Sequence, residues 1–205
     1  MSVELRDKNG LTETEFLQSY RQKDYPRPSL TADLVVIRDG ELPALLLIRR
    51  GGHPYLGCWA LPGGFVAPGE DAQSAAQREL QEETGLGELP LTPLGFYSAP
   101  GRDPRGWVVS AAFLSVSRRF SPVRADDDAA EAAWFAIREE SDTADHLALT
   151  LAHESESLKL RASRRNNPIT GRPEAQVYAS EGIAFDHAQM IADAWLCFEP
   201  NVKEE

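Results

Sequence analysis

The stretch that decides the fold is Gly64-Phe-Val-Ala-Pro-Gly-Glu70, followed after seven intervening residues by Arg78-Glu-Leu-Gln-Glu-Glu-Thr-Gly-Leu86. A helix is predicted over 71–84, because Asp71 can cap its beginning and Gly85 suits the position after its end. Alanines and a leucine between them form an apolar stripe with helical spacing. The sequence therefore predicts a loop, a short amphipathic helix and a second loop.

Three acidic residues of this helix are predicted to form a metal site. Glu79, Glu82 and Glu83 stand three and four residues apart, so their carboxylates crowd one helix face and repel one another. A divalent cation removes this conflict, and Mg²⁺ prefers oxygen ligands while leaving positions for substrate phosphates. Adjacent glutamates alone are usually a solvated surface. The full spacing, with seven fixed identities, would arise by chance at a frequency on the order of 10⁻⁸ per start position.

Residues on either side can support this site. Pro62, Gly63 and Gly64 predict a sharp turn before the helix, where the backbone can approach a metal closely because no side chain blocks it. Arg78 lies beside the acidic face and can orient a carboxylate, and Glu70 in the preceding loop is its natural partner.

The spacing Gly-x₅-Glu-x₇-Arg-Glu-Leu-x-Glu-Glu-x-Gly-Leu matches the Nudix box at every position, and the chain resembles the Nudix hydrolases. The resemblance implies the α/β (α+β) class, as an α/β/α sandwich with a mixed β-sheet and the Nudix loop-helix-loop. It further implies a metal-activated water that attacks phosphorus, with Mg²⁺, or Mn²⁺ as a substitute, as the cofactor. The implied metal ligands are Gly63 through its carbonyl, Glu79, Glu82 and Glu83, with Glu70 and Arg78 in support.

Another carboxylate, from a loop after the box, supplies a ligand or the general base in many Nudix enzymes. Asp126-Asp127-Asp128 lies just before a predicted strand, and Asp128 is the candidate catalytic residue among the three. A solvated acidic turn explains the run about equally well.

Substrate contacts are predicted in two loops. Arg102 and Arg105 lie in a Gly/Pro-rich loop between strands, where their forked donors can bind phosphate or ribose groups. Solvated arginines are the usual alternative, but proximity to a predicted metal site favours binding. His53, in a Gly-Gly-His-Pro loop, is a candidate for contacting the nucleotide or for a hydrogen bond that stabilises its own loop.

Several further motifs narrow the resemblance. Tyr25-Pro-Arg-Pro28, Arg50-Gly-Gly-His-Pro-Tyr55 and Phe185-Asp-His187 resemble the ADP-ribose pyrophosphatase-like branch, which also contains Nudix-related transcriptional regulators of NAD metabolism. The branch implies cleavage of ADP-ribose into AMP and ribose 5-phosphate, and a homodimer. Capping and packing at a helix start explain Phe185 to His187 about as well as catalysis does.

Two alternative functions remain open. The Nudix box would serve a nucleoside triphosphate or another nucleotide sugar equally, because it binds the metal-diphosphate that all these substrates share. An ADP-ribose-binding regulator is the alternative without catalysis. Related regulators carry a winged-helix domain after the Phe-Asp-His helix, and here too few residues follow that helix for such a domain.

Composition limits the partners. The net charge of −11 and a pI near 4.9 argue against a nucleic-acid-binding surface, which needs a basic face. The polar N-terminus and the lack of a long apolar run predict neither signal peptide nor membrane span, so a cytoplasmic location is expected. Cys58 and Cys197 are far apart and are expected to be free thiols.

The domain organisation follows from the apolar runs. Residues 1–28 are expected to be an N-terminal helix, over Glu13–Tyr20, and an extended lead-in. Residues 29–198 are expected to be a single Nudix domain with an extra β-rich segment at about 147–180, and residues 199–205 a disordered tail. A hairpin is predicted where Leu30–Ile37 and Ala44–Ile48 flank Arg38-Asp-Gly-Glu41. The remaining elements predicted are strands at Leu91–Ser98, Val108–Val116 and Trp134–Ile137, short strands at Leu147–His153, Leu158–Ala162 and Ala175–Ala179, and a closing helix at Phe185–Leu196.

Overall fold

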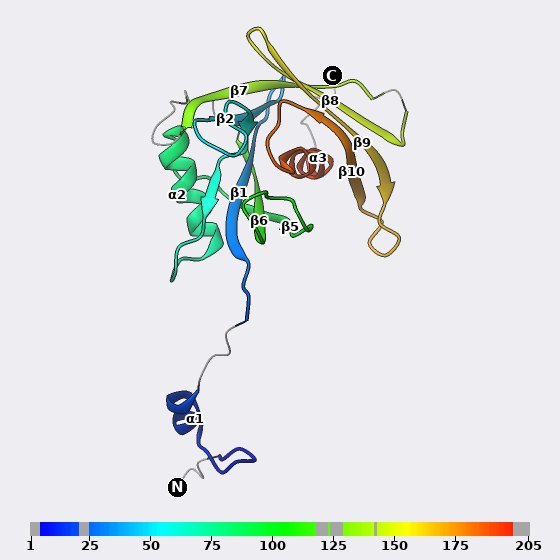
Figure 1. Cartoon of the computed structure of the whole chain (residues 1–205). Coiled ribbons are helices and arrows are strands. Elements are labelled where there is room, and N and C mark those ends of the chain that lie inside the picture. Colours follow the sequence, from blue (N-terminus) through cyan, green and yellow to red (C-terminus); the bar gives the residue numbers. More distant parts are fainter. Residues whose placement is uncertain (1–4, 21–24, 118–122, 124–128, 142, 199–205) are drawn as a thin grey trace.

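The structure is a computed structural model and describes residues 5–20, 25–117, 123, 129–141 and 143–198. One mixed β-sheet forms the middle of the domain, with the strand order β10-β9-β8-β7-β2-β1-β6-β5 (Figure 1). Two short strands lie off this path, β3 beside β2 and β4 beside β1. The strands are β1 (Ser29–Arg38), β2 (Ala44–Arg50), β3 (Trp59–Ala60), β4 (Gly63–Phe65), β5 (Thr92–Tyr97), β6 (Val108–Ser117), β7 (Ala129–Glu139), β8 (His146–His153), β9 (Glu156–Asn166) and β10 (Pro173–Glu181).

The centre of the sheet is apolar on both faces. The residues of β1 from Leu34 to Ile37 are almost completely buried, because helices cover the two sides of the sheet. β1 runs parallel to β6 and antiparallel to β2, and the β1–β2 pair confirms the predicted hairpin. The sheet is therefore mixed, as the sequence predicted.

The predicted helix on one face is confirmed as α2 (Ala72–Thr84). Its N-cap is Asp71, whose side chain accepts a hydrogen bond from the Ser74 N–H, and it ends at Gly85 with φ of 70°. Leu80 and two alanines of the helix pack on buried residues of β1 and β6. Glu83 is buried on the same side of the helix, and Glu79 lies one turn after Ala75, so this packing brings both carboxylates against Gly63 and Gly64 of β4.

The other face of the sheet is covered by α3 (His187–Cys197), which completes the α/β/α sandwich. The helix starts two residues later than predicted. Its N-cap, Asp186, makes no capping hydrogen bond through its side chain, so the expectation of capping at this position is not met. That carboxylate is used instead in an ion pair described below.

The segment at 147–180 extends the sheet rather than forming a separate unit. β8, β9 and β10 form an antiparallel meander, in which Leu147, Leu149 and Leu151 of β8 are buried. Side chains that alternate with these residues point outwards, as expected for strands with one covered face. The extended sheet curls over α3, so that β10 and β5, at opposite ends of the strand order, both lie beside this helix (Figure 1).

The N-terminal helix α1 (Glu13–Ser19) has a capping box at Thr12 and Glu15 but no buried residue. It lies apart from the sheet in Figure 1. Phe16 and Tyr20 share one face, as predicted, with ring centroids 5.5 Å apart. Among the helices in the described ranges, none combines the length and apolarity needed to cross a bilayer. The predicted tail at 199–205 lies outside the described residues.

Candidate active site

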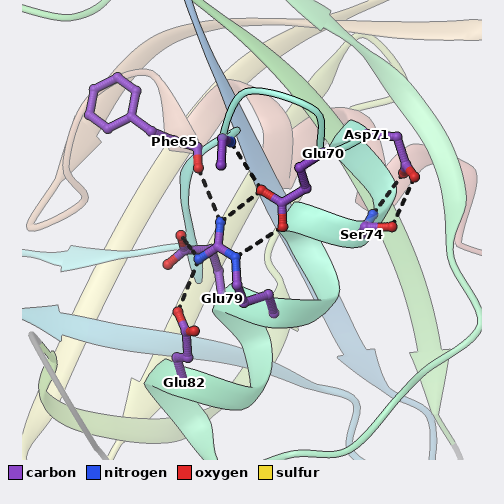
Figure 2. A network of polar contacts seen from close by, with 8 residues as sticks. Phe65, Glu70, Asp71, Ser74, Glu79 and Glu82 are labelled. Carbon is purple, nitrogen blue, oxygen red and sulfur yellow. Dashed lines mark hydrogen bonds and ion pairs between the residues drawn. The ribbon is translucent and has the colours of Figure 1, made fainter.

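Arg78 organises the acidic face of α2 (Figure 2). Its guanidinium donates two hydrogen bonds to Glu70, at 3.0 and 3.1 Å, one to Glu79 at 2.6 Å and one to Glu82 at 3.0 Å. It also donates to the backbone carbonyl of Phe65. The hydrogen bonds that Glu70 and Glu79 accept raise the pKa of Arg78, so this cation is permanent. One arginine thus fixes three carboxylates, two of them on the helix and one in the preceding loop.

Glu83 has different surroundings from its neighbours. It is only 9% exposed, and its carboxylate accepts a hydrogen bond of 2.8 Å from the Gly63 N–H. Burial raises the pKa of Glu83 to about 8, and the negative charges of Glu79 and Asp33 contribute to the rise. Burial also raises the pKa of Glu79, although its hydrogen bond from Arg78 opposes the shift. Both groups would therefore gain from a nearby cation.

Two glycines permit the close approach between β4 and the helix. A methyl group on Gly64 would overlap the carboxylate of Glu79. Gly63 pairs with Asp33 across β1 and β4, and a methyl group there would lie 2.6 Å from the Asp33 Oδ1 atom. The contacts found are with protein atoms, and the predicted close approach of this backbone to a metal stays a prediction.

The donor groups fit a hard divalent cation, although they are not gathered into a cage. Within the described ranges, no three acidic, histidine or cysteine side chains converge on one point that could hold a metal ion. Glu79 and Glu82 bond to Arg78, whereas Glu83 bonds to Gly63. All the donor atoms are nevertheless oxygens, the ligands that Mg²⁺ prefers. One of them belongs to the buried Glu83, which receives no hydrogen bond from a cationic side chain among the described residues. The metal-ligand roles of Glu79, Glu82, Glu83 and Gly63 remain predictions.

A narrow slot of about 50 Å³ adjoins the β4 turn. Gly63 and Gly64 form part of its wall, so the slot and the acidic face of α2 meet at this turn. Three arginines line the slot together with two aspartates, Asp33 and Asp103, so arginines outnumber acids in its lining. These arginines are Arg50, Arg102 and Arg105.

The three arginines differ in how they are held. The Arg102 side chain is 4% exposed and donates two hydrogen bonds to Asp186, at 2.8 and 2.6 Å. Its forked donors are therefore already engaged. Arg105 likewise donates from Nε and Nη2 to Asp103, at 3.0, 3.2 and 2.7 Å, but its side chain is 40% exposed. Its guanidinium lies 5.4 Å from the Phe185 ring. Arg50 lies 5.0 Å from the same ring, so Phe185 is flanked by two cations.

Aromatic residues with unusual backbone geometry stand beside these cations. Tyr55 and Phe185 have φ of 60° and 53°, a backbone region that residues other than glycine rarely adopt. Their ring centroids lie 4.7 Å apart. Such strain persists where the surrounding structure enforces it, often at a functional site. His53 is exposed and does not line the slot, so its predicted substrate contact stays a prediction.

A buried polar cluster adjoins the slot, and two of its members, Asp33 and His187, also line the slot. His187 accepts a hydrogen bond of 2.9 Å from the Leu61 N–H at Nδ1, which places its proton on Nε2, 3.7 Å from Asp33. The Ser110 hydroxyl donates to the other oxygen of Asp33. Complete burial lowers the pKa of His187, so the ring is neutral and its role is to position the β3–β4 connection. The sequence had singled out Phe185-Asp-His187, but not the contact of His187 with Asp33, an aspartate within the apolar β1 segment.

Comparison with known proteins agrees with this geometry. The NUDIX domain profile matches residues 28–154, more than half of the chain. The chain belongs to the Nudix family. Nudix hydrolases generally use divalent metals, in keeping with the oxygen donors on α2. The predicted family and fold class are therefore confirmed.

Two curated relatives of this Nudix hydrolase cover part of its length. An ADP-ribose pyrophosphatase from Methanocaldococcus jannaschii is 43% identical over 119 residues, which are 58% of this chain and 67% of the relative. The ADPR responsive transcriptional repressor NtrR from Acinetobacter baylyi is 37% identical over 112 residues, which are 53% of this chain and 44% of the repressor. The chain thus spans about two thirds of the first relative and less than half of the second.

Solved structures extend the likeness beyond the family match. A MutT/nudix family protein from Enterococcus faecalis is 33% identical, with a TM-score of 0.74. The match covers 90% of this Nudix chain and 68% of the Enterococcus faecalis chain. The NUDIX domain of Shewanella oneidensis NrtR complexed with ADP ribose has a TM-score of 0.56 and 28% identity, covering 62% of this chain and 84% of its own. The first similarity reaches well beyond the 28–154 match.

Proposed function

We propose that this Nudix hydrolase cleaves ADP-ribose into AMP and ribose 5-phosphate with Mg²⁺ as its metal. The observation that carries the proposal is the meeting of an acidic helix face and an arginine-lined slot at Gly63 and Gly64. A diphosphate needs both, since a metal binds its oxygens on one side and arginines bind them on the other. The similarity to an ADP-ribose pyrophosphatase, and to a domain complexed with ADP ribose, supports the choice of substrate.

The roles of the residues follow from their surroundings. Glu79, Glu82, Glu83 and the Gly63 carbonyl would hold Mg²⁺. When bound, Mg²⁺ supplies a water of lowered pKa and neutralises charge on the leaving phosphate. Arg78 positions Glu79 and Glu82, and Glu70 keeps Arg78 in place.

The cationic side of the slot would bind the substrate. Arg105 and Arg50 are the proposed phosphate contacts, because each keeps its guanidinium beside the slot. Arg102 lines the same slot, and its ion pair with Asp186 holds the 100–106 loop against the start of α3. Asp128, the candidate general base, lies outside the described residues.

Product analysis tests the reaction. Purified protein with ADP-ribose and Mg²⁺ is expected to release AMP and ribose 5-phosphate in equal amounts, measured by ion-exchange chromatography. Glu83→Gln should lower turnover by about a hundredfold or more, because it removes one charge of the metal site. Glu88→Gln makes the same chemical change on an exposed residue just after the Nudix helix and serves as the control. Equal turnover in Glu83→Gln and Glu88→Gln would contradict the role given to Glu83.

The same assay separates the alternatives. Release of pyrophosphate from a nucleoside triphosphate, with ADP-ribose left intact, would assign the protein to triphosphate substrates. Tight ADP-ribose binding without AMP release would favour the regulatory class, a candidate that the similarity to NtrR keeps open. The expected homodimer is tested by light scattering, where a chain of 22.6 kDa should give twice its mass. The cytoplasmic location stays a prediction.

A further inference from the structure

The chain just before α3 lies beside β3, at the start of the turn that carries the proposed metal site. The Trp59 N–H donates a hydrogen bond of 3.0 Å to the Gly182 carbonyl, and the Ala184 N–H donates one of 2.8 Å to the Trp59 carbonyl. We call the next three residues, 185–187, the α3 entry. They follow the 28–154 match, so a segment from outside the matched region contacts the Nudix site.

Each residue of the α3 entry contacts a different part of the site. Phe185 lines the slot. Asp186 accepts two hydrogen bonds from Arg102, in the loop between β5 and β6. His187 accepts one of 2.9 Å through Nδ1 from the Leu61 N–H, in the connection between β3 and β4. Three consecutive residues therefore hold an arginine loop and the β3–β4 turn in a fixed relation to each other.

The β3–β4 turn is bonded to three elements through three consecutive residues. The Leu61 N–H donates to His187 of α3. The Pro62 carbonyl accepts a hydrogen bond of 2.9 Å from a β1 amide, and the Gly63 N–H donates to Glu83 of α2. Proline has no N–H of its own, so the bonds of Leu61 and Gly63 hold the two ends of the turn. His187 thus fixes the β3 end of the turn, two residues before the carbonyl that is a proposed metal ligand.

Burial makes the bond between Leu61 and His187 hard to replace. Leu61 is 1% exposed and His187 is 4% exposed, so water does not reach this N–H easily. A buried backbone N–H that loses its acceptor is costly, and the surrounding backbone must then move to find another partner. The ring must be neutral to accept at Nδ1, and burial lowers the pKa of His187 accordingly. The contact is therefore suited to hold the turn in one place.

We propose that His187 is a positioning residue for the metal, which sets the affinity of the site for a divalent cation by holding the turn that carries Gly63 against Glu83. The inference rests on the proposed function, since it concerns the metal of that reaction. His187 acts through the backbone and not as a ligand, because the Nδ1 lone pair is already used by Leu61. Groups that orient metal ligands in this way typically change metal affinity by about 10–100-fold when they are altered.

Two substitutions of His187 separate the roles of its ring nitrogens. Asparagine places its amide oxygen near the position of Nδ1 and can accept from the Leu61 N–H. Glutamine carries its amide to the position of Nε2, so the Leu61 N–H loses its acceptor. Mn²⁺ binding without substrate is measured from the electron paramagnetic resonance signal of the free ion. His187→Gln should raise the Kd for Mn²⁺ by about tenfold or more, whereas His187→Asn should bind Mn²⁺ nearly as tightly as the unaltered protein.

A control variant separates positioning from a general loss of stability. His153→Gln removes another contact between a histidine and the backbone, here with the Trp134 carbonyl on β7. This change should lower Tm, measured by circular dichroism, but should leave the Kd for Mn²⁺ unchanged. A rise in Kd for His153→Gln equal to that for His187→Gln would mean that any weakened core reduces metal binding, and it would overturn the proposal.

NMR of the unaltered protein gives a test that needs no variant. Long-range ¹H–¹⁵N spectra are expected to show a neutral His187 ring with its proton on Nε2. Titration with Mg²⁺ should shift both the Nδ1 signal of His187 and the amide signal of Leu61, because the bond between them is part of the turn. A proton on Nδ1, or signals that stay unmoved when Mg²⁺ saturates the protein, would overturn the inference.

The remaining outcomes distinguish this inference from the proposed function. Equal Mn²⁺ affinities in His187→Gln and His187→Asn, whether both retained or both lost, would show that the Leu61 contact does not set metal affinity. ADP-ribose cleavage is measured separately on the unaltered protein. The expected Mn²⁺ affinities without cleavage would refute the proposed substrate alone, whereas cleavage with equal Mn²⁺ affinities in the two variants would refute this inference alone.

Discussion

Replacing Asp186 with asparagine is expected to destabilise the protein by about 3 kcal/mol. Asp186 accepts two hydrogen bonds from Arg102, and that arginine is almost fully buried. Asparagine keeps the size of the side chain but not its charge, so the guanidinium would remain buried without its partner. Removing one member of such a pair costs about 3–5 kcal/mol. The lower end applies here, because Asp33 and Asp103 also act favourably on the Arg102 charge.

Thermal unfolding followed by circular dichroism measures this loss. For a chain of 150–250 residues, each kcal/mol lowers Tm by about 2–4 °C, so the expected fall is about 6–12 °C. Glu131→Gln is the control, because it removes one carboxylate from an exposed ion pair with Arg49 and should cost less than about 1 kcal/mol. The double variant Arg102→Met/Asp186→Leu should be more stable than Asp186→Asn, since neither residue then leaves a charge unpaired.

The outcome decides the role of Arg102. The sequence predicted that this arginine binds substrate, whereas in the structure its Nε and Nη2 atoms donate hydrogen bonds to Asp186. If Asp186→Asn lowers Tm by less than about 3 °C and also raises KM for ADP-ribose, the structural role of Arg102 is refuted and direct substrate binding is favoured.

Three further predictions follow from individual contacts. Gly64→Ala should displace the Glu79 carboxylate, because the new methyl group would overlap it. The Mg²⁺ concentration needed for half-maximal activity should rise, while circular dichroism shows an intact fold. An unchanged metal requirement would contradict this prediction. Arg105→Ala should raise KM for ADP-ribose by about tenfold with little change in kcat, because its proposed contact already exists in the ground state; a fall in kcat alone would argue against that contact. Burial raises the pKa of Asp193 above its ordinary value of 3.8. The stability that this shift contributes is therefore complete below pH 3.8 and is lost as the pH rises through the higher pKa of the folded protein. Asp193→Asn should therefore flatten the decline of Tm over this pH range, and parallel Tm profiles for the two proteins would contradict the assignment.

Local features of the fold were predictable from the sequence, because each depends on residues close together in the chain. The cap at Asp71, the end at Gly85 and the spacing of the glutamates define α2 through helix geometry alone. The β1–β2 hairpin depends on a short turn between two apolar runs in the same way. The pairing of Arg78 with Glu70 spans only eight residues and was also predictable.

Contacts between residues far apart in the chain could not be predicted from the sequence. Arg102 meets Asp186 across 84 residues, and Leu61 meets His187 across 126. No local pattern specifies such partners, since they depend on how far the sheet curls and on which strands reach α3. For the same reason the sequence could suggest short strands at 147–180 but not that they extend the sheet around the helix.

The sequence by itself therefore determined the Nudix box, its helix and the acidic residues that one helix face must share. Tertiary structure alone decided that Arg102 pairs with Asp186 and that Asp33 lies beside the β4 turn. The physical reason is that helix periodicity acts over three or four residues, whereas these arrangements arise only when distant strands and α3 pack against one another.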